Sequence, residues 1–238
     1  MGAAMIFRFR IRACVVVAAI VSAFSCAANA TIPTTERDAL IALYTNTNGA
    51  GWVASTGWNG AAGTECTWFG VACDGTSAHV ASISLSFNNL TGTIPSLDDL
   101  SNLQGFSVAF NQLTGTIPSL SGLSNLVYFD GSFNQLTGAI PSLSGLGNLQ
   151  GFYVGANQLT GAIPDLTGTA LTNFLAGANH LDGALPVAPI SLAAGGSTLC
   201  PNDFPASSYV DDPAWDAATG FTPWYTPCNL IFANGFEF

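Results

Sequence analysis

The sequence predicts an α/β repeat solenoid with a short parallel β-sheet along its concave face. Five similar phrases follow one another between Ile83 and Pro186, and each keeps an asparagine, a leucine, a glycine, an aliphatic residue and a proline in the same order. The asparagines are Asn88, Asn111, Asn134, Asn157 and Asn179, so the period is 23 residues three times and then 22. Such a period is typical of a solenoid, because so small a unit buries its apolar face only against the next unit. Inward and outward residues alternate just before each asparagine, which predicts one short strand per unit.

Composition separates the chain from proteins that bind nucleic acids or anionic membranes. Charged residues make up 8% of the chain, lysine is absent, and three of the four arginines lie in the first dozen residues. Without residues 1–30, one arginine would face 14 acidic side chains, a formal charge of −13. Such a surface repels phosphate backbones and anionic lipids. The polar surface is mostly neutral, which suits an exported protein that meets sugars or other proteins.

Residues 1–30 are predicted to be a signal peptide. An arginine-rich start is followed by an apolar run over residues 13–24 and by a small-x-small cleavage site that ends at Ala30. The apolar run has 12 residues, whereas a membrane-spanning helix needs about 20. We therefore expect cleavage after Ala30 and a secreted, cell-surface or periplasmic location. A lipoprotein signal that uses Cys26 is the alternative, although the Phe-Ser pair before it is a poor lead-in to a lipidated cysteine.

Residues 31–78 are predicted to form an N-terminal cap. The pattern from Thr34 to Tyr44 is helical, with its apolar residues on one face. A glycine-rich stretch with Trp52, Trp58 and Trp68 follows. Tryptophan clusters can bind ligands, but directly before a solenoid we expect them to cover the apolar end of the first repeat, as terminal repeats require.

These phrases resemble a known family. The segments TERDALIALY, GW, GWN and CTWFGVACD, followed by SISLSFNNLTGTIP, resemble the N-terminal cap and first repeat of plant-type extracellular leucine-rich repeat proteins. That family includes receptor ectodomains and polygalacturonase-inhibiting proteins, and similar repeats occur in secreted proteins of bacteria and protists. The resemblance covers residues 34–186 and implies a leucine-rich repeat fold that binds partners. The units are one residue shorter than is usual in the family, the sequence contains no kinase domain, and nothing in it fixes the residues that would recognise a polygalacturonase.

The five repeats are placed at residues 79–190, and residues 191–238 are predicted to be an irregular C-terminal cap and tail. The closing segment NLIFANGFEF resembles a short tail on some exported bacterial proteins, which favours a bacterial source. Four cysteines remain after the signal peptide, and four cysteines allow three pairings. Sequence order favours Cys66 with Cys73 and Cys200 with Cys228, and export would preserve both bridges.

The repeated positions are predicted to be scaffold, and the variable strand positions are predicted to be the binding surface. An asparagine amide both donates and accepts, so it can pair backbone groups that a buried turn would leave unsatisfied. The outward strand positions are mostly small, apart from Tyr128, Asp130 and Tyr153. The aromatic residues that precede the first three asparagines either pack between units or form an exposed strip. Our hypothesis is that an extracellular protein, peptide or glycan binds the set Tyr128, Asp130, Tyr153, Phe110 and Phe133.

Other classes of function are less well supported. Threonine rows on flat solenoid faces can order water or ice, and Thr91, Thr114, Thr137 and Thr160 form such a row, although hydroxyl-to-backbone bonds within the turns also explain it. Catalysis, for example on a cell wall, needs converging titratable groups, and Asp130 is alone on the predicted concave face. No cofactor is expected. No metal is expected either, because Cys-x6-Cys is a poor zinc signature.

Overall fold

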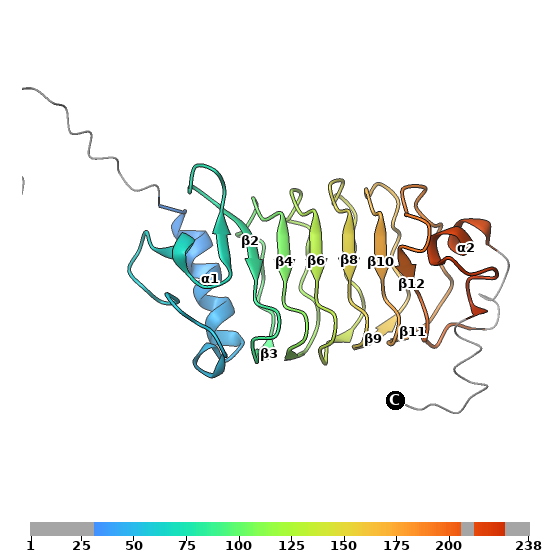
Figure 1. Ribbon diagram of the computed structural model, residues 1–238, viewed down its shortest axis with the longest axis horizontal. Coiled ribbons are helices and arrows are strands. Elements are labelled where there is room, and N and C mark those ends of the chain that lie inside the picture. Colours follow the sequence, from blue (N-terminus) through green and yellow to red (C-terminus); the bar gives the residue numbers. More distant parts are fainter. Residues whose placement is uncertain (1–30, 206–211, 227–238) are drawn as a thin grey trace, which may run out of the picture.

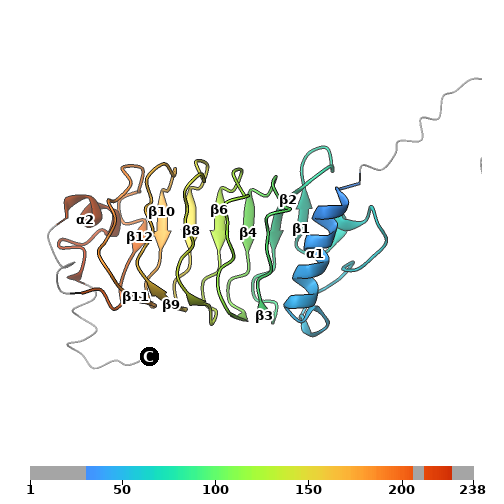
Figure 2. The ribbon, with the colours of Figure 1, turned by 180° about the vertical axis from the view of Figure 1, so that it is seen from behind.

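The computed structural model describes residues 31–205 and 212–226, and these form an elongated stack of short turns (Figures 1 and 2). Helix α1 lies at one end of the stack and helix α2 at the other. The predicted signal peptide and the NLIFANGFEF segment lie outside the described residues. In chain order the elements are α1 (Thr34–Asn46), η1 (Gly49–Gly51), η2 (Glu65–Thr67), β1 (Val71–Cys73), β2 (Val80–Ser84), β3 (Thr91–Thr93), β4 (Gly105–Ser107), β5 (Gln112–Thr114), β6 (Tyr128–Asp130), β7 (Thr137–Gly138), β8 (Gly151–Tyr153), β9 (Gln158–Gly161), β10 (Asn173–Leu175), β11 (His180–Leu181), β12 (Ser197–Thr198) and α2 (Pro213–Thr219).

The main sheet has seven strands in the order β1-β2-β4-β6-β8-β10-β12. The first pair is antiparallel and all the others are parallel. The register places Phe106 opposite Phe129 and Phe129 opposite Phe152, so equivalent residues of successive units are direct neighbours. The predicted parallel sheet is therefore confirmed, and the strand β1 extends it on the N-terminal side. Further short strands form two separate small sheets, β3-β5 and β7-β9-β11.

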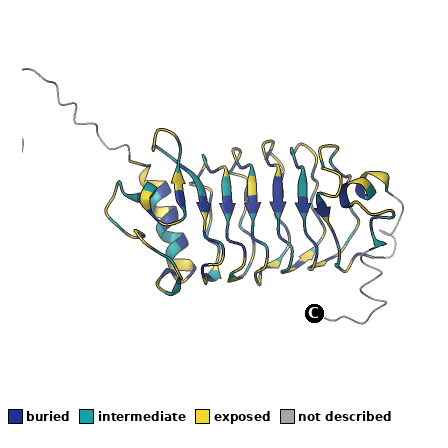
Figure 3. Cartoon of the chain, viewed as in Figure 1, coloured by how far each residue is buried: buried dark blue, intermediate teal, exposed yellow. Residues whose placement is uncertain are grey.

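The core runs along the axis of the solenoid. Phe106, Phe129, Phe152 and Phe174 are fully buried at the middle of their strands, and neighbouring rings stack with centroids 5.3–6.0 Å apart. The leucine that follows each asparagine is also buried in every unit. Figure 3 shows that strands of the main sheet contain buried residues next to less buried ones. Trp215 of α2 lies 6.4 Å from the Phe174 ring and covers the C-terminal end of this row.

The asparagines form a ladder of buried or half-buried amides. Asn134 Oδ1 accepts a hydrogen bond from the Leu113 N–H at 2.9 Å, and Asn134 Nδ2 donates to the carbonyls of Val108 at 3.0 Å and of Gly131 at 3.2 Å. Each amide thus satisfies backbone groups of its own turn and of the preceding turn. This confirms the role predicted for the asparagine column, in which the side chain replaces the backbone partners that a turn lacks.

The asparagine ladder continues for one step beyond Pro186, where the repeated phrase disappears from the sequence. Asn202 Oδ1 accepts from the Leu181 N–H at 2.9 Å, and its Nδ2 donates to the Ala176 carbonyl at 2.9 Å. The strand β12 of the same segment pairs in parallel with β10. The sequence analysis places residues 191–205 in an irregular cap. They nevertheless retain the asparagine hydrogen bonds and the parallel strand pairing that join one turn to the next.

The N-terminal segment packs directly on the first turn. The helix predicted from Thr34 to Tyr44 extends to Asn46, and the carboxylate of Glu36 joins it to β2, accepting from the Val80 N–H at 2.7 Å. Trp52, Trp58 and Trp68 are buried and contact one another edge to face or tilted, with centroids 4.9–5.1 Å apart. Because these rings are buried, they do not form an exposed ligand platform.

One predicted disulfide lies within the described residues. Cys66 and Cys73 are bonded, and this bridge joins η2 to β1. Cys200 is also disulfide-bonded, and its predicted partner Cys228 lies outside the described residues.

Candidate functional site

The outward strand positions of the main sheet are small in the first two turns, and the third and fourth turns carry two tyrosines and an aspartate there. Strands β6 and β8 are parallel neighbours, and their register sets Tyr128 beside Gly151 and Asp130 beside Tyr153. The two tyrosine rings lie 5.0 Å apart, and Tyr128 is more exposed than Tyr153. The structure therefore brings together the three strand residues that the sequence analysis proposed, and we call them the tyrosine–aspartate patch.

Gly151 gives the patch its compact shape. A Cβ atom at this position would lie 2.6 Å from Tyr153 Cε2 and 3.1 Å from Tyr128 Cδ2. The Tyr153 ring thus folds across the glycine toward Tyr128, and any side chain at residue 151 would force it away. Sequence analysis placed Gly151 on this face only as a small residue and missed this contribution.

Hydrogen bonds hold the carboxylate of Asp130 at the centre of the patch. The Tyr128 hydroxyl donates to Asp130 Oδ2 at 3.0 Å, and the Ser132 N–H donates to Asp130 Oδ1 at 3.0 Å. Burial raises the pKa of the Tyr128 phenol, and the charge of Asp130 raises it further. The same two causes raise the pKa of Tyr153. Both phenols therefore remain neutral donors well above neutral pH.

The negative charge of Asp130 has no cationic partner within the described part of the chain. The one arginine in that part, Arg37, forms an ion pair with Glu65 in the N-terminal segment. The two histidines bond to Glu36 and to Asp203. Both hydrogen-bond donors to Asp130 are neutral groups, so the patch presents an uncompensated carboxylate between two aromatic rings.

A stack of three exposed rings runs beside the patch, and we call it the phenylalanine ladder (Phe87, Phe110 and Phe133). Adjacent rings are nearly parallel, at 10° and 9°, with centroids 4.2 Å apart in both pairs. The three side chains are 69%, 42% and 51% exposed. The two alternatives for this column, packing between units and an exposed strip, are therefore both present, since the rings cover one another and still face solvent.

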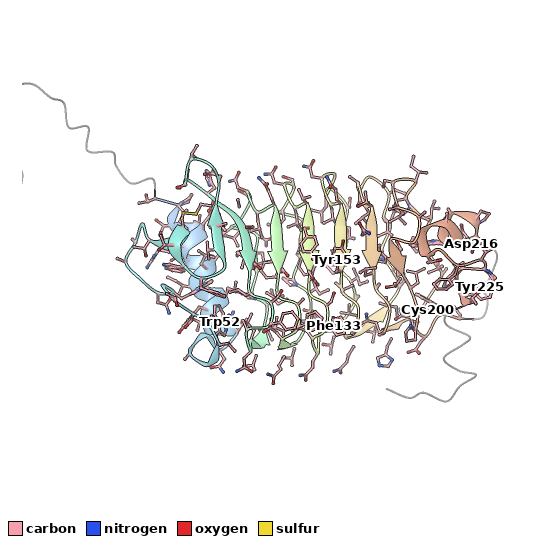
Figure 4. All side chains as sticks on the ribbon, in the orientation of Figure 1. Trp52, Phe133, Tyr153, Cys200, Asp216 and Tyr225 are labelled. Atoms are coloured by element: carbon pink, nitrogen blue, oxygen red, sulfur yellow. A yellow bond between two sulfur atoms is a disulfide. The ribbon has the colours of Figure 1, made fainter. Side chains whose placement is uncertain are left out.

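The phenylalanine ladder ends at a groove. Ala156 and Ala178 occupy the equivalent positions of the next two turns, with the same left-handed backbone, at φ 55° and 56° against 54° for Phe133. Their methyl groups leave a groove of about 740 Å³. Its lining residues are Ser132, Phe133, Gly155, Ala156, Asn157, Leu175, Gly177, Ala178, Asn179, His180, Thr198, Cys200 and Pro201. Figure 4 labels Phe133 and Cys200, which lie at opposite ends of this lining along the axis of the solenoid.

The groove differs from the tyrosine–aspartate patch in its chemistry. No acidic residue lines it, and its walls are mostly apolar carbon. Its one titratable side chain, His180, bonds to Asp203 with a nitrogen–oxygen distance of 3.0 Å. Sequence analysis did not predict this groove, although the change from phenylalanine to alanine in one repeated column was a signal that pointed to it.

The remaining candidate residues do not converge. The Thr114 hydroxyl donates to the Gly92 carbonyl of the preceding turn at 3.1 Å, so this bond joins two turns and differs from the expected bond within one turn. The threonine row crosses two separate small sheets, β3-β5 and β7-β9-β11. Within residues 31–205 and 212–226, no three His, Cys, Asp or Glu side chains gather to form a metal site. None of the helices in these ranges has the length and hydropathy of a membrane span.

The repeated parallel strands and the asparagine ladder define a leucine-rich repeat solenoid, and solved structures with the same fold are leucine-rich repeat ectodomains of plant receptors. The BIR2 ectodomain from Arabidopsis thaliana is 27% identical, with a TM-score of 0.61 over 72% of this chain and 94% of that one. A chain of the Arabidopsis thaliana BIR3–SERK2 complex is 26% identical, with a TM-score of 0.54 over 69% and 95%. No protein-family model matches the sequence.

A third similar structure is a much longer protein. The ectodomain of the Arabidopsis thaliana receptor kinase GASSHO1/SCHENGEN3, solved in complex with CASPARIAN STRIP INTEGRITY FACTOR 2, is 27% identical with a TM-score of 0.61. The match covers 71% of this chain but 21% of that ectodomain. The chain thus spans nearly all of the small ectodomains and about a fifth of the large one.

Proposed function

We propose that this protein is an exported leucine-rich repeat module that binds an extracellular protein, peptide or glycan through its concave face. The contacts are assigned to Tyr128, Asp130, Tyr153, Phe110 and Phe133. The observation that carries the proposal is the tyrosine–aspartate patch, where two aromatic rings and an uncompensated carboxylate stand on a face that is mostly lined by small residues. Tyrosines in such positions supply much contact area at little cost in conformational entropy, which is typical of binding hot spots.

Two further observations support binding as the role of this face. The phenylalanine ladder is a contiguous exposed apolar strip beside the patch, and such strips mark interaction sites. The similar BIR3–SERK2 and GASSHO1/SCHENGEN3 structures are complexes with a second protein. By contrast, Asp130 is the one carboxylate of the patch, and its bonded donors are the Tyr128 hydroxyl and the Ser132 N–H, with no histidine or second carboxylate beside them among the described residues. We therefore assign this face to binding and not to catalysis.

Affinity capture with residues 31–238 tests the proposal. Extracellular proteins and cell-wall glycans are passed over the immobilised wild type and over a Tyr128→Ala/Tyr153→Ala variant. We expect the double variant to keep its unfolding midpoint within a few degrees and to lose the captured partner. A Thr137→Ala/Thr160→Ala variant, which changes two exposed residues of the small sheets, is the matched control and should retain it. A folded Tyr128→Ala/Tyr153→Ala variant that captures the same partner equally well would show that the concave face is not the binding surface.

Export is tested separately from binding. Expressed with residues 1–30, the chain should be released with Thr31 as its first residue, which N-terminal sequencing of the exported product measures. Retention of residues 1–30, or a lipidated product beginning at Cys26, would overturn this part of the proposal.

A further inference from the structure

The tyrosine–aspartate patch and the groove are parts of one continuous surface. Ser132 joins them, because its N–H donates to the Asp130 carboxylate at 3.0 Å and the same residue lines the groove. Phe133, the next residue, forms the first wall of the groove. A ligand that follows the chain direction of the third turn therefore meets the carboxylate first and the groove directly afterwards.

The patch has the chemistry of a cation site. Asp130 holds an uncompensated charge on a chain whose formal net charge is −10, and two tyrosine rings flank it. A lysine ammonium or an arginine guanidinium is attracted both by a carboxylate and by the face of an aromatic ring. A neutral sugar can stack on the rings, but it brings no charge to match Asp130.

The groove begins where the next aromatic ring of the phenylalanine ladder would lie. The phenylalanine ladder places one ring per turn at a spacing of 4.2 Å, and the series stops at Phe133. The backbone at Ala156 repeats that of Phe133, so a phenylalanine at residue 156 would set its ring against the Phe133 face that is now open. The absence of acidic residues in the groove also suits an apolar ring, in contrast to the patch.

We propose that this surface binds a polypeptide that places a lysine or arginine side chain at Asp130 and a nearby aromatic side chain against Phe133, in the position that Ala156 leaves open. This inference rests on the proposed function and specifies the partner's chemistry at the same face. Charge complementarity selects the basic residue, and the ladder geometry selects the aromatic one. The two subsites lie on adjacent turns of the solenoid and are joined by Ser132, so one short segment of the partner can reach both.

Selection from a random peptide display library against immobilised residues 31–238 tests the inference without a known ligand. We expect the enriched peptides to carry a basic residue within a few positions of Trp, Tyr or Phe. One synthetic enriched peptide is then measured against two variants. Asp130→Asn should weaken binding about tenfold and abolish the advantage of the basic residue over glutamine. Ala156→Phe should abolish the advantage of the aromatic residue over alanine, because its own ring fills the subsite.

The variants are chosen so that loss of folding does not imitate loss of binding. Phe133 shows that a phenylalanine adopts the backbone of residue 156. A Thr160→Phe variant is the matched control, since it adds a ring to the same turn at an exposed position outside the lining of the groove. It should bind the peptide as the wild type does.

Several results would overturn the inference. Enrichment of acidic or purely aliphatic peptides would contradict it, as would no enrichment over a blank surface. Unchanged binding of a basic–aromatic peptide to both Asp130→Asn and Ala156→Phe would also contradict it. In that case the overall negative charge of the chain, and not the two subsites, would explain the enrichment of such peptides. If capture yields a glycan, or a protein without this pairing, and still depends on Tyr128 and Tyr153, the proposed function stands and the inference fails. Conversely, if the folded Tyr128→Ala/Tyr153→Ala variant captures the partner as well as the wild type does, the proposed function fails, and the inference that rests on it fails too.

Discussion

Two neighbouring columns of the solenoid, one residue apart in sequence, behave in opposite ways. The asparagine column keeps its residue in every turn and directs each amide into the stack, where it bonds backbone groups of two turns. The column just before it points its side chains to solvent and changes from phenylalanine in three turns to alanine in two. The invariant column makes every turn fit its neighbour, whereas the varying column makes one part of the surface differ from another. In this molecule, exact repetition marks the scaffold and a break in repetition marks the proposed binding surface.

The largest effect should follow from a change beside the invariant column. Leu136→Ala removes a fully buried side chain, and we expect it to lower the free energy of unfolding by about 2–5 kcal/mol, because the rigid stack closes the cavity poorly. Urea unfolding measures this. The adjacent exposed Thr137→Ala should change it by less than about 0.5 kcal/mol. Equal effects at the two positions would break the distinction between scaffold and surface.

The asparagine column itself should show the next largest effect. Asn134→Ala leaves the Leu113 N–H without its partner and removes one of the two amide donors to the Val108 carbonyl. We expect a loss of about 1–3 kcal/mol in the free energy of unfolding. Gln135→Ala, at the exposed neighbouring position, is the matched control and should be close to neutral. A melting temperature unchanged by Asn134→Ala would refute the structural role of the ladder.

The side chains of the varying column should contribute less to stability than the asparagines. The contribution of each phenylalanine should increase with the number of rings on which it stacks. Phe110 stacks on two rings and Phe87 on one, and an aromatic pair contributes about 0.5–1.5 kcal/mol. We expect Phe110→Ala to cost about 1 kcal/mol and Phe87→Ala roughly half as much, measured by urea unfolding. If both variants cost as much as Leu136→Ala, the rings belong to the core and not to the surface.

The smallest effect concerns the protonation of the patch. The pKa of Tyr128 is raised in the folded protein, so the unfolded chain loses this proton first when the pH passes about 10. The stabilisation is complete below that pH and is lost as the pH rises toward the folded pKa. We expect unfolding experiments above pH 10 to show a smaller fall in stability for Tyr128→Phe than for the wild type. Parallel curves would contradict the raised pKa.

The scaffold could be predicted from the sequence because each of its requirements recurs. Each leucine, asparagine and glycine position has the same surroundings in every turn. A residue type that recurs at such a position therefore indicates its structural role from the sequence. The positive backbone angles at the glycine column, from 73° at Gly115 to 88° at Gly92, agree with the predicted need for glycine. The patch residues Tyr128, Asp130 and Tyr153 were also found, since they break an otherwise small-residue pattern on one strand face.

What could not be predicted depends on two turns at once. The groove exists because Phe133 in one turn faces Ala156 in the next, and Gly151 matters because rings from two strands cross above it. The continuation at Asn202 was missed for a different reason. The asparagine recurs 23 residues after Asn179, but its flanking residues no longer match the phrase, while its hydrogen bonds are retained.

The asparagine ladder also bears on how such a chain can evolve. At the N-terminal end of the ladder, the Asn88 side chain exchanges hydrogen bonds with the backbone of Ala54. At the C-terminal end, Asn202 accepts a hydrogen bond from the Leu181 N–H. The non-repeated segments at both ends therefore use the same kind of side-chain-to-backbone bond that joins the repeats to one another. Duplication or deletion of one whole repeat therefore preserves the asparagine hydrogen bonds between adjacent turns, and no new type of contact is needed. Unequal recombination of the gene by whole repeats can lengthen or shorten the phenylalanine ladder and the groove. A new surface can arise in this way while every intermediate sequence still encodes a protein that folds.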